Sequence, residues 1–363
     1  MQKNLKIKNE PYWWSDAKPD FIDQVEWSSN ADVLIVGAGY TGLSAALTLL
    51  DSGLKVIIID KEIAGFGASS RNGGITSGKI KPSIRELKSK FGLDLSKQIV
   101  EEGNLARKDL YDFIKKEKID CDLKINGMFV GATSKKGLEN QKKEIDFNFR
   151  SIGIENKIIE KKDVPDFIES NKYVGGIFDK RIGSIHPAKL VKSMIHLVQK
   201  KGGLIFDKTT FKKSERNGKK FYIWTNKGLV KSNHLIIATN AYTDKNIPWL
   251  RKKLIPVISE MISTCEIGNN RVNSLMPKLT TFGEELNLFY YFRPSPDGKR
   301  ILIGGRRVRY NNENPTKKLK SGLLEIFPGL NDIEISNHWY GFVTFPVDQI
   351  PKLVMHEGII YAA

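Results

Sequence analysis

The sequence predicts an α/β fold in which helices cover a parallel sheet, together with a second α+β domain built on a mixed or antiparallel sheet. Three observations predict it. An apolar strand at residues 33–36 leads through a glycine-rich turn into a helix that reaches residue 50. A second apolar strand, residues 55–59, follows this helix at the spacing of a βαβ unit. Residues 246–335 then alternate short strand-like and polar pieces, as antiparallel sheets do.

The turn after the first strand has a Gly-x-Gly-x-x-Gly pattern formed by Gly37, Gly39 and Gly42. Gly37 permits a tight turn, Gly39 lets a pyrophosphate approach the backbone, and Gly42 lets the helix pack close to the strand. Asp60 follows the second strand, where a carboxylate accepts a hydrogen bond from a ribose hydroxyl and disfavours a 2′-phosphate. We therefore predict a three-layer, Rossmann-like dinucleotide-binding domain. NADP is not expected, and NAD remains a rival ligand for this motif.

The other elements follow from periodicity and turn residues. Helical spacing and capping residues predict helices at residues 81–120, 135–170 and 187–200. Alternation and turn residues predict strands at residues 122–133, 204–206, 254–264, 288–293 and 300–304, a buried strand that begins at His234, and a β-meander over residues 208–232.

Composition limits the class of protein. The chain has 363 residues, 40% of them hydrophobic, and this length suggests two domains. The net charge of +17 would suit an acidic partner. However, the lysines are scattered and no basic block alternates with aromatic residues, so we expect a solvated basic surface and no nucleic-acid partner. The longest apolar stretch is interrupted by glycines and polar residues, so no membrane span is expected.

Two distant cysteines, Cys121 and Cys265, predict free thiols in a reducing compartment. The first six residues contain no apolar segment of a signal peptide, so we expect a cytoplasmic protein. No cluster of His, Cys and carboxylate residues suggests a metal site. Residues 1–30 form an irregular lead-in, in which Trp13 and Trp14 are expected to pack on the protein rather than face a partner.

A second glycine-rich loop spans residues 65–74 and reads Gly-Phe-Gly-Ala-Ser-Ser-Arg-Asn-Gly-Gly. Such a loop lets backbone N–H groups and hydroxyls approach a flat or anionic ligand. Together with the first motif, it resembles the FAD-dependent D-amino-acid oxidase/glycine oxidase superfamily (DAO-type oxidoreductases), and within it the gamma-glutamylputrescine oxidase-like branch. That branch usually has Gly-Ala-Ser-Gly-Arg-Asn-Gly-Gly, so Ser70 replaces a glycine here. The resemblance implies FAD as the cofactor.

Further segments carry the same resemblance: residues 183–191, the Ala-Thr-Asn-Ala-Tyr sequence at 238–242, the hairpin at 290–306 and the segment 339–351. The resemblance implies a discontinuous FAD-binding domain made of residues 31–120, 181–245 and 336–363. It implies a substrate domain made of residues 121–180 and 246–335.

The resemblance implies that the protein oxidises the C–N bond of a small amine or amino acid, acting on a CH–NH2 or CH–NH donor. A hydride would move to the flavin N5 and the resulting imine would hydrolyse, with O2 or another acceptor taking the electrons. The predicted cofactor-binding residues are Gly37, Ala38, Gly39, Tyr40, Thr41, Gly42, Asp60, Lys61, Ser69, Ser70, Arg71, Asn72, Gly73, Thr239 and Asn240. Arg71 lies near the phosphates or the flavin in one interpretation and is a structural loop arginine in the other.

His186, Tyr291 and Arg293 are weak candidates for catalysis. The alternative to a catalytic role for His186 is that it is an ordinary histidine at the start of a helix. Strand alternation places Tyr291 and Arg293 on one face, where ordinary sheet packing is the alternative. Two other functions stay open: a non-catalytic or truncated flavoprotein subunit, and a family member that acts on an amine carried by a nucleic acid.

The end of the sequence differs from the family pattern. In the family, the strand at residues 358–363 continues into a Gly-x-x-Gly-x-Gly loop and a long helix beside the flavin, and neither follows Ala363 here. We therefore expect a truncated sequence. Because the missing helix would leave apolar sheet uncovered, the chain by itself is expected to hold FAD weakly.

Overall fold

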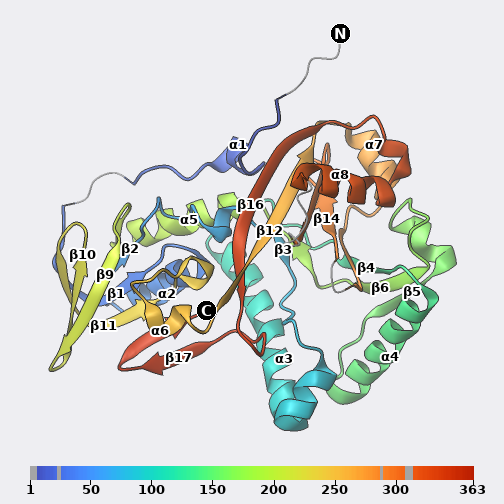
Figure 1. The fold of residues 1–363 in the computed structure, drawn as a ribbon. Coiled ribbons are helices and arrows are strands. Elements are labelled where there is room, and N and C mark those ends of the chain that lie inside the picture. Colours follow the sequence, from blue (N-terminus) through green and yellow to red (C-terminus); the bar gives the residue numbers. More distant parts are fainter. Residues whose placement is uncertain (1–5, 23–25, 287–288, 307–313) are drawn as a thin grey trace. The chain divides into compact units, whose positions relative to one another are not determined.

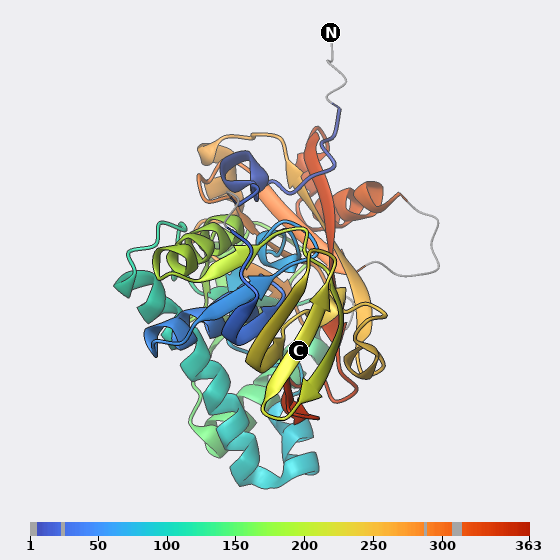
Figure 2. The ribbon, with the colours of Figure 1, turned by 90° about the vertical axis from the view of Figure 1, so that its left-hand side faces the viewer.

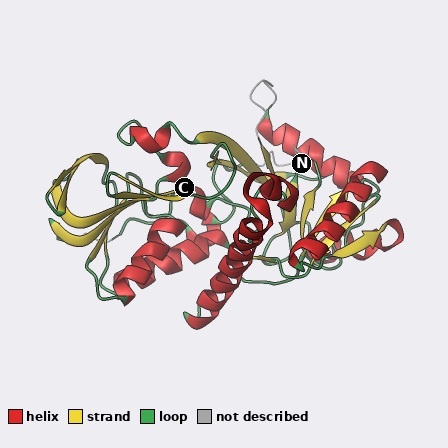
Figure 3. Cartoon of the chain, turned by 90° about the horizontal axis from the view of Figure 1, so that it is seen from below, coloured by secondary structure: helices red, strands yellow, loops and turns green. Residues whose placement is uncertain are grey.

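The computed structural model describes residues 6–22, 26–286, 289–306 and 314–363. This part of the chain divides into two compact units, and each combines helices with strands (Figures 1 and 3). The unit that we call the βαβ unit consists of Trp13–Asn72, Pro187–Val257 and Gly341–Ala363. The unit that we call the mixed-sheet unit consists of Met1–Tyr12, Gly73–His186 and Ile258–Tyr340.

The βαβ unit contains an eight-stranded sheet. Its strands are β1 (Asn30–Val36), β2 (Val56–Ile59), β8 (Leu204–Phe206), β9 (Phe211–Asn217), β10 (Lys220–Thr225), β11 (Leu229–Ile237), β17 (Leu353–His356) and β18 (Ile359–Ala362). Strands β18, β11, β1, β2 and β8 are parallel neighbours in that order. Val33 of β1 pairs with Val56 on one side and His234 on the other. The predicted parallel sheet is therefore confirmed.

The helices of this unit are α1 (Trp14–Ala17), α2 (Tyr40–Asp51), α5 (Pro187–Lys200) and α6 (Pro248–Arg251), with 3₁₀ turns η1 (Ala68–Ser70) and η3 (Asn240–Tyr242). Alternation along β1 places successive side chains on opposite faces of the sheet. Leu34 belongs to an apolar core with Ile223 and Val230 of the β9–β10–β11 meander, which Figure 2 shows as adjacent strands. Ile35 faces the other way, toward Gly42 of α2. These three layers confirm the predicted Rossmann-like architecture.

The mixed-sheet unit is built on a second eight-stranded sheet in the order β16-β12-β15-β14-β13-β4-β6-β5. Its strands are β4 (Met128–Ala132), β5 (Lys157–Glu160), β6 (Gly175–Asp179), β12 (Ile255–Thr264), β13 (Thr281–Glu284), β14 (Tyr291–Pro294), β15 (Ile301–Arg306) and β16 (Ile335–Phe345). β13 pairs with β4 in parallel, whereas β14 and β15 form the predicted antiparallel hairpin. The sheet is therefore mixed, as predicted.

The other elements of this unit are α3 (Ile84–Lys116), α4 (Lys135–Ile152), α7 (Asn269–Leu275), α8 (Pro315–Ile326), 3₁₀ turns η2 (Lys161–Asp166) and η4 (Pro328–Leu330), and the short paired strands β3 (Ile75–Thr76) and β7 (Gly183–Ser184). The predicted helix at 81–120 is confirmed as α3, with a kink at Gly92, whose φ of 76° is not helical. Its start at Ile84 is explained by Ser83, whose side chain forms a capping box with Glu86.

Two sequence-based boundaries differ from the structure, and a third lies outside the described residues. The predicted helix 135–170 was wrong beyond Ile152, because Gly153 ends α4 in the left-handed region (φ 67°) and residues 157–160 join the sheet as β5. Residues 73–120, predicted with the first domain, belong to the mixed-sheet unit, because β3 pairs with β7 and α3 contacts α4 there. The predicted strand start at residue 288 lies outside the described residues, and so do residues 1–5 and 23–25 of the lead-in.

Other sequence-based expectations can be compared directly. Trp13 is fully buried, which confirms that it packs on the protein. Cys121 and Cys265 form no disulfide with each other. Among the helices that the structure describes, none has the length and apolar character needed to cross a membrane.

A buried carboxylate joins three neighbours in the mixed-sheet unit. Glu284, at the end of β13, accepts hydrogen bonds from the Tyr173 hydroxyl at 3.1 Å and the Tyr290 backbone N–H at 3.1 Å. The Lys172 ammonium lies 2.6 Å from the same side chain. Burial, together with this carboxylate, raises the pKa of Tyr173, so the phenol stays a hydrogen-bond donor. Glu284 therefore joins Tyr173, Tyr290 and Lys172 in one buried cluster.

We expect Glu284→Gln to lower the free energy of unfolding by about 3 kcal/mol, because it leaves the Lys172 ammonium without its closest anion in a buried site. Urea unfolding of the purified chain measures this. The matched control is Glu325→Gln, since the Glu325 carboxylate lies 3.6 Å from the same ammonium but is 58% exposed. It should change the stability by less than about 1 kcal/mol. Equal effects of the two substitutions would contradict a special role for burial.

Candidate functional site

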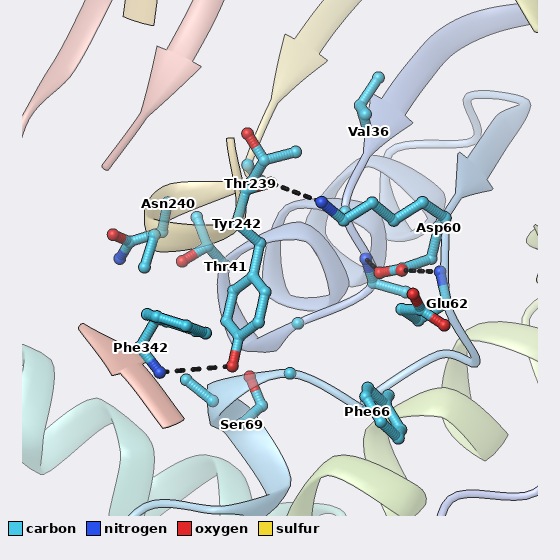
Figure 4. A pocket seen from close by; sticks show the side chains of 18 of the residues that line it. Val36, Thr41, Asp60, Glu62, Phe66, Ser69, Thr239, Asn240, Tyr242 and Phe342 are labelled. Atoms are coloured by element: carbon cyan, nitrogen blue, oxygen red, sulfur yellow. Dashed lines mark hydrogen bonds between the residues drawn. The ribbon is translucent and has the colours of Figure 1, made fainter. Parts of the chain in front are cut away.

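A cavity of about 530 Å³ lies within the βαβ unit, at the carboxyl ends of its parallel strands (Figure 4). Ligands of open α/β sheets bind at this edge. The predicted cofactor-binding residues that line the cavity are Gly37, Ala38, Gly39, Tyr40, Thr41, Asp60, Lys61, Ser69, Asn72, Thr239 and Asn240. The two sequence motifs and the Ala-Thr-Asn segment thus meet around one space.

The glycine turn is packed at distances that exclude larger side chains. Gly37 has a φ of 109°, and a Cβ there would lie 2.7 Å from the Ala238 carbonyl oxygen. A Cβ on Gly42 would lie 1.9 Å from the Gly37 carbonyl oxygen. The turn and helix-packing roles predicted for Gly37 and Gly42 are therefore confirmed. Gly42 serves this packing and does not itself line the cavity.

Helix α2 begins at the cavity. Gly39 is its N-cap residue, and no acidic side chain lies in its first turn to neutralise the positive end of the helix dipole. The Tyr40 N–H donates to the Ser69 hydroxyl at 3.0 Å, which joins the first motif to the second. This helix end can therefore attract an anionic group such as a phosphate.

Asp60 connects the end of β2 to the glycine turn. Its carboxylate accepts the Ala38 N–H at 2.8 Å and the Glu62 N–H at 2.9 Å (Figure 4). Burial raises the pKa of the Asp60 carboxyl, and these two hydrogen bonds oppose that shift. The next residue, Lys61, donates to the Tyr242 carbonyl oxygen at 2.8 Å across the cavity wall.

Ser70, Arg71 and Gly73 do not line the cavity. Ser70 is fully buried, and its hydroxyl accepts a hydrogen bond from the Trp14 indole at 3.1 Å. The Arg71 guanidinium lies over the Trp14 ring. Gly73 belongs to the mixed-sheet unit. The contacts of Arg71 correspond to the structural interpretation of that residue.

Several lining residues were not predicted. Thr209 and Thr210 follow β8, a strand that the sequence predicted as parallel. Because ligands of parallel sheets bind at the strand ends, the sequence could have identified these two residues. Phe342 and Thr344 come from the end of β16 that belongs to the βαβ unit, and the sequence pointed to this region only through the family resemblance of residues 339–351. Within the site, the Tyr242 and Phe342 rings form an edge-to-face contact with centroids 5.8 Å apart (Figure 4). The Thr344 hydroxyl donates to the Asn240 side chain.

The candidate catalytic residues belong to the mixed-sheet unit. The Arg293 guanidinium is buried and donates to the backbone carbonyls of Ile185 at 2.7 Å and Gly74 at 3.1 Å. Burial lowers its pKa to about 10. The Tyr291 hydroxyl lies 2.9 Å from the Ser259 hydroxyl.

The ring of Tyr291 borders Gly73, whose carbonyl oxygen also accepts from Arg293 at 3.4 Å. The two side chains thus lie on the same face of β14, as alternation predicted. His186 is fully buried, and its backbone N–H donates to the Cys121 carbonyl oxygen at 2.7 Å.

The cavity residues fit the adenosine diphosphate part of FAD. The glycine turn provides backbone without Cβ atoms, and the α2 N-terminus provides a positive dipole end for the phosphates. The Asp60 carboxylate provides an acceptor for a ribose hydroxyl.

Comparisons with known proteins agree with this fit. A family model described as FAD dependent oxidoreductase (DAO) matches residues 32–363. Gamma-glutamylputrescine oxidoreductase of Escherichia coli (strain K12) is 30% identical over 353 residues, covering 94% of this chain and 80% of the relative. Probable oxidoreductase OrdL of Rhizobium meliloti (strain 1021) is 28% identical and covers 89% of this chain and 76% of that relative.

Solved structures share the fold. Glycine oxidase from Geobacillus kaustophilus superimposes with a TM-score of 0.74 at 19% identity, covering 93% of this chain and 89% of the other. L-proline dehydrogenase from P. horikoshii gives a TM-score of 0.74 at 16% identity, covering 93% and 88%. The predicted family and the predicted cofactor, FAD, are thereby confirmed. This chain belongs to the DAO family of FAD dependent oxidoreductases.

Proposed function

We propose that this protein uses FAD to oxidise the C–N bond of a small amine or amino acid. The observation that carries the proposal is the cavity formed by the glycine turn, Asp60 and the second glycine-rich loop in a chain of this family. The names of similar proteins support the substrate class: gamma-glutamylputrescine oxidoreductase, glycine oxidase, L-proline dehydrogenase and iminodiacetate oxidase all refer to amines or amino acids.

In this proposal each part of the cavity binds one part of FAD. The first N–H groups of α2 hold the diphosphate, and Gly39 lets it approach the backbone. Asp60 accepts a hydrogen bond from the adenosine ribose, and its bonds to the Ala38 and Glu62 N–H groups hold the carboxylate in place. Thr239 and Asn240, which follow β11, line the same cavity.

FAD, when bound, supplies the acceptor for a hydride from the carbon next to the amine nitrogen. The substrate would lose this hydride from carbon and a proton from nitrogen, two electrons and two protons in all, and would become an imine, which water hydrolyses to a carbonyl compound and an amine or ammonia. O2 or another acceptor takes up the two electrons. We also propose the cytoplasmic location expected from the sequence. The division into an FAD-binding and a substrate domain is likewise a proposal.

Tyr291 is the stronger substrate-side candidate of the mixed-sheet unit. Its ring lies in contact range of Gly73 at the end of the second glycine-rich loop. Arg293, in contrast, directs its guanidinium to backbone carbonyls of residues 73, 74 and 185, which supports a structural role for it. His186 keeps its place as a weaker candidate.

The FAD site can be tested with Asp60→Asn. We expect the dissociation constant for FAD to rise about tenfold, because an amide cannot accept both backbone N–H groups and is a weaker acceptor for the ribose. Titration of the apoprotein with FAD measures it. Asp32→Asn is the matched control, since Asp32 accepts the Lys55 N–H at 2.8 Å at the start of β2 and does not line the cavity. Similar effects of both variants would contradict the assigned site.

The reaction can be tested with an amine panel. We expect at least one of gamma-glutamylputrescine, glycine, proline or iminodiacetate to bleach the yellow absorbance of the FAD-loaded protein without air, because oxidation of the amine reduces the flavin. The control is acetate, which lacks the amine. Readmitted air should restore the colour if O2 is the acceptor. A yellow protein that no amine bleaches would support the non-catalytic flavoprotein instead.

A further inference from the structure

Two adjacent tryptophans of the lead-in contact the loop that lines the cofactor cavity. We propose that Trp13 and Trp14 are positioning residues that hold residues 66–72 in the conformation that binds FAD. The inference rests on the proposed FAD site, because the loop matters only if FAD occupies that cavity. Neither tryptophan lines the cavity itself, so both would act through the loop.

Both indole N–H groups donate to the loop. The Trp13 Nε1 lies 2.9 Å from the Asn72 carbonyl oxygen, and the Trp14 Nε1 lies 3.1 Å from the Ser70 hydroxyl. Trp13 and Ser70 are fully buried, so water cannot replace these partners. The two bonds therefore fix the last turn of the loop from outside the cavity.

Arg71 adds a stacked contact. Its guanidinium carbon lies 4.5 Å from the centroid of the Trp14 ring and 4.3 Å from that of the Phe66 ring. Its Nε donates to the Phe66 carbonyl oxygen at 2.8 Å, which closes the loop on itself. The two rings also contact each other, with centroids 5.5 Å apart. A planar cation within reach of both rings is a specific arrangement that lysine or an aliphatic residue would not reproduce. This cluster connects Trp14 to Phe66, which does line the cavity.

The loop needs such external support. Gly65 and Gly67 leave its backbone free to adopt other conformations, and the 3₁₀ turn η1 has no side-chain cap. Ser69 of this turn accepts the Tyr40 N–H at the start of α2. A shift of the loop would therefore disturb both the cavity wall and the α2 N-terminus.

The lead-in is also anchored on the other side of the loop. Asp207 is buried and accepts the Ile22 N–H at 2.9 Å with one oxygen and the Ala64 N–H at 2.7 Å with the other. Residues 13–14 hold the end of the loop, and Asp207 joins residue 22 of the lead-in to the residue before Gly65. The lead-in and the loop are therefore joined at both ends.

The test compares Trp14→Ala with Trp249→Ala in the full chain. Trp249 stacks on His356 at 4.5 Å and contacts Tyr361 at 4.5 Å in the same unit, without lining the cavity. Trp14→Ala should raise the dissociation constant for FAD about tenfold, or about 1.4 kcal/mol. It should also speed amide hydrogen exchange of residues 66–72 in the apoprotein. Trp249→Ala should lower thermal stability but change neither readout.

Equal FAD affinity of the two variants, or unchanged exchange at residues 66–72, would overturn the proposal. If Trp14→Ala does not fold, Trp14→Phe decides, because it keeps a ring beside Arg71 and removes only the bond to Ser70. It should weaken FAD about threefold, and wild-type affinity would count against the proposal. Asp60→Asn distinguishes failure of the proposed FAD site from failure of the role of the tryptophans. If it leaves FAD binding unchanged, the assignment of the cavity to FAD fails as well.

Discussion

The close packing of backbone at the carboxyl end of β1 is the constraint on which the rest of the site depends. The carbonyl oxygens of Gly37 and Ala238 occupy the space that side chains on Gly42 and Gly37 would need. Because the backbone passes so close, α2 starts directly above the strand ends and directs its first N–H groups to the cavity. A bulkier turn would move the helix start, and the positive end of its dipole would leave the position that we propose for the diphosphate.

Around this turn, side chains from distant segments bond to backbone atoms. Asp60 reaches Ala38, Ser69 reaches Tyr40, and Trp13 reaches Asn72. Each bond satisfies a buried or partly buried polar group, so each also removes a reason for the loop to rearrange. The cavity wall is thus held by polar contacts between loops, whereas the apolar core is formed by side chains of the parallel strands and the meander.

Two buried charged side chains of the mixed-sheet unit have different kinds of partner. Glu284 is matched by Lys172, which offsets its removal from water. Arg293 is surrounded by backbone carbonyls, and burial lowers its pKa. Both groups connect a sheet strand to neighbouring segments. A charged residue in a strand of an enzyme is therefore not by itself a sign of contact with substrate.

The sequence by itself determined the strand–turn–helix unit, the order of the parallel strands β1 and β2, the position of Asp60 after β2, and the family. These features follow from local periodicity and from residues whose conformation or chemistry has few alternatives, such as Gly37 with its positive φ. The hairpin β14–β15 was predictable for the same reason, since its turn residues are adjacent in the chain.

Only the tertiary structure decided which loop residues line the cavity. Ser69 and Arg71 are neighbours in one glycine-rich loop, yet Ser69 faces the site and Arg71 stacks on Trp14. Thr344 contributes to the site from a strand more than a hundred residues beyond Asn240. Such contacts join segments without a shared period, and the direction of each side chain in an irregular loop depends on packing against distant residues. The physical reason is that a strand or helix repeats its own geometry, whereas a loop takes its geometry from its partners.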